Sequence, residues 1–202
     1  MNKISGETFS QEIEKWLKSD GPKTLSSLIE VFGAKSFGVI ILFLMIIPAL
    51  PLPTAGVTHV FEIVVMLLAL EMIGGLKTIW LPNRWQNMRL GKIMERRAIP
   101  MIARRISWFE RRSSPRWRRV FELPLMSQLI GLLIFIFALA AFLAPPLTGL
   151  DTLPSMGVVV ICLGLILEDS LFLFVGSFFG SLGVAIIIGL STFVIKLLSE
   201  LF

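Results

Sequence analysis

Three long apolar runs without a charged residue dominate the chain. Residues 36–58, 123–150 and 170–195 contain no Asp, Glu, Lys, Arg or His. Roughly 20 apolar residues span a hydrocarbon core of about 30 Å as a helix, so each run is long enough to cross a membrane. Strands of a membrane barrel would alternate polar and apolar residues, whereas these runs are apolar on every face. The pattern therefore predicts an all-α integral membrane protein.

Prolines interrupt two of these runs. The interruptions are at Pro48, Pro51 and Pro53 in a first membrane unit, residues 35–82, and at Pro145 and Pro146 in a second, residues 124–202. Proline lacks a backbone N–H and clashes with the preceding helical turn, so a straight helix through these positions is not expected.

Each unit reads as an apolar helix, a proline break, small or polar residues, a second apolar helix and an acidic residue. This similarity predicts two related units, which could form an inverted repeat with re-entrant segments as in many transporters. The alternative stays open, because proline-kinked helices are common in membranes without any duplication. The second unit ends in a Gly-rich helix, whose Gly176-x-x-x-Gly180 face suits close helix packing within or between chains.

The N-terminal segment, residues 1–34, predicts two short amphipathic helices at the membrane interface. The first covers residues 8–20 and places Ile13 and Trp16 on one face; the second starts at Thr24 as N-cap and ends before Gly33. Ten charged residues among the first 35 argue against a cleaved signal peptide, so the mature chain is expected to start at Met1.

Composition and charge agree with this class. Of 202 residues 55% are hydrophobic and only 16% charged, which is unusual for a soluble domain. The charges concentrate in a loop, residues 83–123, where residues 84–119 hold twelve Lys or Arg and two acids. Such an excess marks the cytoplasmic side of a membrane.

The basic loop also carries tryptophans, a mixture that occurs in nucleic-acid-binding proteins. We favour arginines meeting anionic lipid headgroups while tryptophans lie at the interface, with no nucleic-acid partner. The same loop could dock a cytoplasmic protein. The arginines with this lipid-facing or partner-facing role are Arg111, Arg112, Arg116, Arg118 and Arg119.

Ionisable residues inside membrane segments are costly, by roughly 2.5 to 3.5 kcal/mol on insertion scales, so each is a candidate for function. Here they are His59, Glu62, Glu71, Asp151, Glu168 and Asp169. If the two breaks meet near the midplane, freed carbonyls and helix ends would line a polar cavity for a small solute or ion. The proline breaks would line this site, with His59, Glu62, Glu71, Glu168 and Asp169 as its polar residues.

Two of these assignments have plain structural alternatives. His59 and Glu62 are three residues apart, so on a helix they could share a proton or a cation, or they could be a pair exposed at the headgroup level. Asp169 could simply cap the helix that follows it.

Soluble catalytic signatures are absent from the sequence. It contains no Walker loop, no GxSxG and no HExxH, and it has one His and one Cys, Cys162. We therefore expect no enzymatic activity, no cofactor and no metal site.

Several short motifs resemble a known family. They are Gly21-Pro22-x-Thr24-Leu25, Pro48-Ala49-Leu50-Pro51-Leu52-Pro53, Trp80-Leu81-Pro82, Ser114-Pro115-Arg116 and Leu163-Gly164-Leu165-Ile166-Leu167-Glu168-Asp169. In this order they resemble the ExoD family of bacterial exopolysaccharide-synthesis membrane proteins. The resemblance implies a multi-pass protein of the bacterial inner membrane linked to exopolysaccharide production, and it supplies no catalytic residues. The second break departs from the family pattern, with Ala144-Pro145-Pro146 in place of a Pro-x-Pro.

Two functions remain in competition. The first is a small transporter-like protein that moves a small polar solute or ion past the proline breaks. The second is a non-transporting scaffold or regulator that docks exopolysaccharide-synthesis proteins through the basic loop. A homo-oligomer, most simply a dimer, is compatible with either function.

Overall fold

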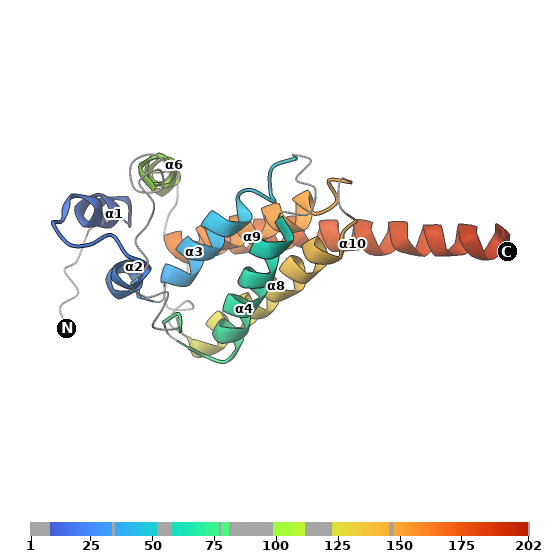
Figure 1. The fold of residues 1–202 in the computed structure, drawn as a ribbon, viewed down its shortest axis with the longest axis horizontal. Helices are drawn as coiled ribbons and strands as arrows, with labels where there is room; N and C mark the ends of the chain where they lie inside the picture. The colour runs from blue at the N-terminus through green and yellow to red at the C-terminus, as the bar shows by residue number, and fades with distance from the viewer. Residues whose placement is uncertain are drawn as a thin grey trace.

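The computed structural model describes residues 9–33, 35–51, 58–76, 78–80, 99–111, 123–145 and 148–201. Within these ranges the chain is helical and contains no β-strand, which confirms the all-α class. In chain order (Figure 1) the helices are α1 (Phe9–Lys18), α2 (Leu25–Phe32), α3 (Lys35–Met45), α4 (Thr58–Ile73), α6 (Ile99–Glu110), α8 (Pro124–Leu143), α9 (Thr152–Leu167) and α10 (Ser170–Leu201).

The first two helices begin and end where their local sequence predicts. Thr24 caps α2: its side chain accepts from the backbone N–H of Ser27, and the Ser27 hydroxyl accepts from the N–H of Thr24. Gly33 ends the helix with a positive φ of 53°, a conformation that favours glycine. Both short helices expected from the sequence are thus confirmed.

A bundle of α3, α4, α8, α9 and α10 forms the apolar core, in which α9 packs against α3, α8 and α10 while α4 packs against α8 and α3 (Figure 1). Gly38, near the start of α3, lies against Ile166, near the end of α9. Gly131, early in α8, lies against Met72, late in α4. These contacts make α3 antiparallel to α9 and α4 antiparallel to α8.

Both proline breaks consequently lie at one end of this bundle. The C-terminal ends of α3 and α8 and the N-terminal ends of α4 and α9 meet there, and we call this the break end (Figure 1). We call the other end of these four helices, where α3 and α8 begin and α4 and α9 finish, the opposite end. Pro145 directly follows the last helical carbonyls of α8, a position that proline favours because it cannot continue the helix.

Small residues allow α9 and α10 to approach closely. A Cβ at Gly157 would lie 2.6 Å from the Cα of Gly180, and a Cβ at Gly176 would lie 2.7 Å from the backbone N of Ile161. The expected small-residue face is therefore used within the chain, where it packs against α9.

Among the described residues, two helical segments are long and apolar enough to cross a membrane, residues 125–143 in α8 and 170–193 in α10. Only 17% of the α10 segment is buried inside the protein, and the C-terminal half of α10 projects beyond the bundle (Figure 1). Large apolar side chains such as Ile188 and Phe193 are more than half exposed there. Apolar surface of this kind suits a lipid environment and agrees with the membrane protein that the sequence predicts.

The α3 and α9 helices are apolar but shorter than a bilayer core. With 11 and 16 residues they measure about 16 and 24 Å, against about 30 Å of hydrocarbon. How many full crossings the chain makes, and whether the two broken units are related by an inverted repeat, stay predictions.

The α1, α2 and α6 helices lie together beside the opposite end of the bundle (Figure 1). The apolar face of α1, with Ile13 and Trp16, is buried in the same apolar core as Ile106 of α6. Phe109 of α6 meets Phe172 of α10 edge to face, with ring centroids 5.7 Å apart, and this contact joins the small helices to the bundle.

Candidate functional site

The only histidine in the chain pairs with a buried acid at the break end. His59 and Glu62 occupy the first turns of α4, and Nδ1 of His59 lies 2.8 Å from Oε2 of Glu62. The His59 side chain is 28% exposed, whereas the Glu62 side chain is completely buried. The edge of Phe142, from α8, contacts the His59 ring with centroids 5.2 Å apart. Protein therefore covers Glu62 completely and His59 in part.

Glu62 lies on the buried stripe of α4, in register with Thr58, Val65 and Ala69 at spacings of three and four residues. The side chain of Thr58, itself buried, lies within hydrogen-bonding reach of the Glu62 carboxylate. The second carboxylate oxygen, Oε1, has no hydrogen-bond partner among the described residues. A buried carboxylate oxygen without a partner is costly, so this position is not explained by packing alone.

The second unit contributes polar groups to the same end. Asp151, immediately before α9, is close enough to interact electrostatically with Glu62. Ser155 follows one turn later on the buried face of α9; its side chain is inaccessible to solvent and its Oγ has no partner in the described part of the chain. The break end thus combines Glu62, Asp151, His59 and two buried hydroxyls.

The other candidate acids lie at the opposite end, where each has a local partner. Oε2 of Glu71 accepts the backbone N–H of Trp80 at 2.9 Å, and Oε1 of Glu168 lies 3.1 Å from Nζ of Lys35. Asp169 accepts the N–H of Leu171 at 3.0 Å and so caps the start of α10. Glu71 lies nine residues along α4 from Glu62, a rise of about 13.5 Å, whereas Glu168 and Asp169 follow the far end of α9, which is about 24 Å long.

The prolines expected to line the site are only partly described. Pro48 is buried at the end of the first apolar run, whereas Pro51 and Pro145 are exposed. Pro53 and Pro146 lie outside the described residues, so their part in the site stays a prediction.

Of the basic loop, the structure describes α6 and Arg111, which is exposed just after that helix. Arg112, Arg116, Arg118 and Arg119 lie outside the described residues. The lipid-facing or partner-facing role of these arginines stays a prediction.

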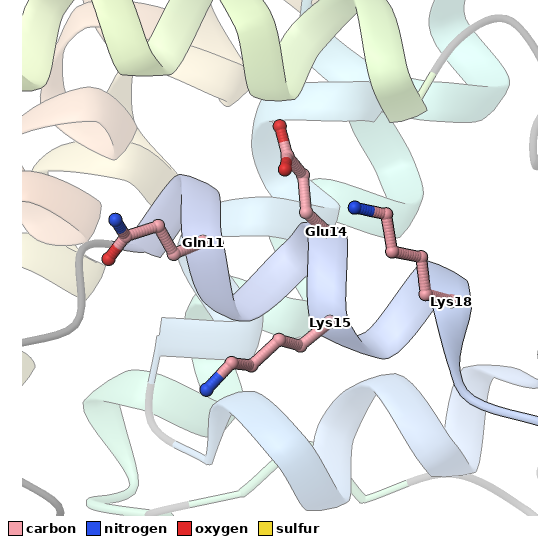
Figure 2. A pocket seen from close by; sticks show the side chains of 4 residues that line it. All are labelled: Gln11, Glu14, Lys15 and Lys18. Carbon is pink, nitrogen blue, oxygen red and sulfur yellow. The ribbon is translucent and has the colours of Figure 1, made fainter.

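A shallow hollow on α1 lies away from the break end. Its lining residues, Gln11, Glu14, Lys15 and Lys18, all belong to that one helix (Figure 2). Their side chains are exposed and carry mixed charge, and none is among the site residues expected from the sequence. The described residues contain no cluster of three or more His, Cys, Asp or Glu that could hold a metal.

Three residues of the break end escaped the sequence reasoning: Thr58, Phe142 and Ser155. A signal existed for the hydroxyls, since Thr58 is four residues before Glu62 and Ser155 is four residues after Asp151. Each hydroxyl therefore shares a helical face with an acid. No signal marked Phe142, because its contact with His59 depends on how α8 packs on α4.

Comparisons with known proteins agree with the motifs. The family model described as "Exopolysaccharide synthesis, ExoD" matches residues 9–189. An uncharacterized protein of Synechocystis is 28% identical over 180 residues, which are 86% of this chain and 82% of that protein. No solved structure matches the chain. The resemblance seen in the motifs is confirmed: the chain belongs to the ExoD family, which links it to exopolysaccharide synthesis.

Proposed function

We propose that this protein is a multi-pass protein of the bacterial inner membrane that moves a small polar solute or ion past the break end, in support of exopolysaccharide synthesis. The observation that carries the proposal is the fully buried Glu62, paired with His59, at the meeting point of two interrupted helical units. An acid inside an apolar bundle is expensive, and in membrane proteins such acids commonly mark ion or proton pathways.

The arrangement of helix ends supports this role. Two helix N-termini and two helix C-termini gather beside Glu62 and Asp151. N-terminal N–H groups favour anionic atoms and C-terminal carbonyls favour cations, so such a meeting point offers both kinds of partner to a passing solute. Broken helices that meet in this way form the central sites of several transporter folds.

Short helices favour a re-entrant topology in this proposal. An α3 of about 16 Å cannot cross a bilayer alone, so α3 and α4 would enter and leave from one side, with α8 and α9 as the related pair. The basic loop would lie in the cytoplasm, where its arginines meet anionic lipids. A dimer would be compatible with the exposed apolar surface of α10.

Transport is tested with purified protein in vesicles. We expect flux of protons, sodium or one of a panel of small polar solutes with the natural chain, and at least a tenfold loss in Glu62→Gln. Glu71→Gln is the matched control, because Glu71 is on the same helix and bonds to Trp80 instead of facing the buried pair. Full flux in Glu62→Gln, or no flux in the natural chain across the panel, would refute the proposal and leave the scaffold as the better function.

A further inference from the structure

We infer that the break end binds a small monovalent cation of the sodium type, with Glu62 and Ser155 among its oxygen ligands. The inference deepens the proposed function, on which it rests, by naming the class of ion that the site holds. Two buried oxygen atoms that have no hydrogen-bond partner among the described residues carry it: Oε1 of Glu62 and Oγ of Ser155, both on side chains with no solvent exposure.

The break end carries an excess of acidic side chains, which favours a positively charged ligand. Residues 36–76 and 123–167 contain no Lys or Arg, and their ionisable side chains at this end are Glu62, Asp151 and His59. Two carboxylates therefore face a single imidazole, which leaves at least one negative charge without a partner even when His59 is protonated. Glu62 is fully buried and Asp151 is partly exposed, so a cation bound beside them would offset the repulsion between the two carboxylates.

The ligand atoms are of the type that hard cations prefer. Carboxylates, hydroxyls and main-chain carbonyls are oxygen ligands, and Glu62, Thr58 and Ser155 supply the first two kinds. The C-terminal carbonyls of α3 and α8 lie at the same end of the bundle and would supply the third.

A monovalent ion fits better than a divalent one. Sites for Ca²⁺ and Mg²⁺ generally gather several carboxylates, whereas the described residues hold no group of three His, Cys, Asp or Glu. The two segments between described helices at this end, residues 52–57 and 146–147, contain none of these residue types either. Soft metals are disfavoured because no thiol and only one imidazole is at this end.

A proton is the natural competitor for the same carboxylate. The groups that act on Glu62 are His59 from its own helix and Asp151 from the start of α9. The other packing partners add none, since α8 has no ionisable side chain and the only one on α3, Lys35, pairs with Glu168 at the opposite end. Cation binding should therefore weaken at acid pH.

The experiment measures thermal unfolding of the full-length protein in detergent, with sodium, lithium or potassium chloride replacing choline chloride at constant ionic strength. A ligand that binds only the folded state raises the melting temperature as its concentration rises. At pH 8 we expect sodium to raise it by several degrees in the natural chain and in Glu71→Gln. The shift should disappear in Glu62→Gln, and Ser155→Ala should need roughly tenfold more sodium for half its effect.

The inference is overturned if sodium and lithium are no more stabilising than choline in the natural chain, or if Glu62→Gln shows an equal sodium shift. The first needs no variant, so a variant that fails to fold does not weaken the test. Stabilisation by acid pH alone would assign the site to a proton and also overturn it. If the protein binds sodium but shows no flux, the transport proposal alone is refuted. If it shows flux that does not depend on sodium, only this inference is refuted.

Discussion

Charged groups at the two ends of the helical bundle have very different surroundings. At the opposite end, Glu168 pairs with Lys35 across α3 and α9, and Asp169 caps the first turn of α10. At the break end, Glu62 and Ser155 are fully buried, yet within the described part of the chain each keeps an oxygen atom without a hydrogen-bond partner. The same helices thus carry satisfied polar groups at one end and unsatisfied ones at the other.

The small helices beside the opposite end extend this contrast. The Glu110 carboxylate of α6 accepts both the N–H and the hydroxyl of Ser10 at the start of α1. Lys23 is buried, but its Nζ donates to the carbonyl oxygen of Trp16 near the end of α1 and to the carbonyl and hydroxyl oxygens of Ser19 just after it. Satisfied groups of this kind stabilise a fold, whereas unsatisfied buried groups in a native protein call for a ligand or a mechanism.

The largest expected effect comes from separating the helices that hold both ends in place. α9 carries Asp151 at one end and Glu168 at the other, and it lies tightly against α10 at Gly176. In Gly176→Leu, the new Cβ would lie 2.7 Å from the backbone N of Ile161 and 2.8 Å from the carbonyl O of Gly157. We expect a loss of about 3 kcal/mol in unfolding free energy, measured by chemical denaturation in detergent.

The matched control is Gly189→Leu on the same helix, where no atom lies within 4 Å of a new Cβ. Stability should be unchanged or slightly raised, since leucine favours helix more than glycine does. Equal destabilisation by both substitutions would contradict the packing of α9 on α10 and, with it, the placement of the two ends.

Local sequence predicted the satisfied features better than the unsatisfied ones. Thr24 and Gly33 mark the ends of α2 by capping rules that need only neighbouring residues, and the structure follows them. The capping of α10 by Asp169 likewise needs only nearby backbone. His59 and Glu62 share a face at i,i+3, so their contact was also predictable.

The sequence could not predict which polar residues lie at the same end of the bundle, because this depends on long-range helix packing. Glu71 and Glu168 looked like site residues because each ends an apolar run, but the antiparallel packing of the helices puts both at the end away from Glu62. Asp151 comes near Glu62 only because α9 starts at the end of the bundle where α4 starts, a relation that no local pattern contains.

The second prediction compares the effect of neutralising an acid at each end. In sodium-free buffer, Glu62→Gln should raise the free energy of unfolding by about 1 to 2 kcal/mol, because it removes a buried charge while its amide oxygen can still accept from His59. Glu110→Gln should lower it by about 1 kcal/mol, since it weakens a charge-assisted cap on α1. Denaturant titration of both variants in choline chloride shows whether each substitution raises or lowers the free energy of unfolding. Destabilisation by both would mean that Glu62 is a structural residue, like Glu110.

The smallest effect is expected at the Lys35–Glu168 ion pair, whose side chains are 33% and 22% exposed. A double-mutant cycle with Lys35→Gln and Glu168→Gln should give a coupling of about 0.5 kcal/mol, because solvent screens a pair this accessible. The coupling should shrink as potassium chloride is raised, while flux and sodium stabilisation stay at natural levels. Glu168 has a positive φ of 53°, a conformation that costs a residue with a Cβ and sometimes accompanies function. If either single variant lost flux while its stability stayed normal, the Lys35–Glu168 pair would have a role in transport. The contrast between a structural end and a functional end of the bundle would then be wrong.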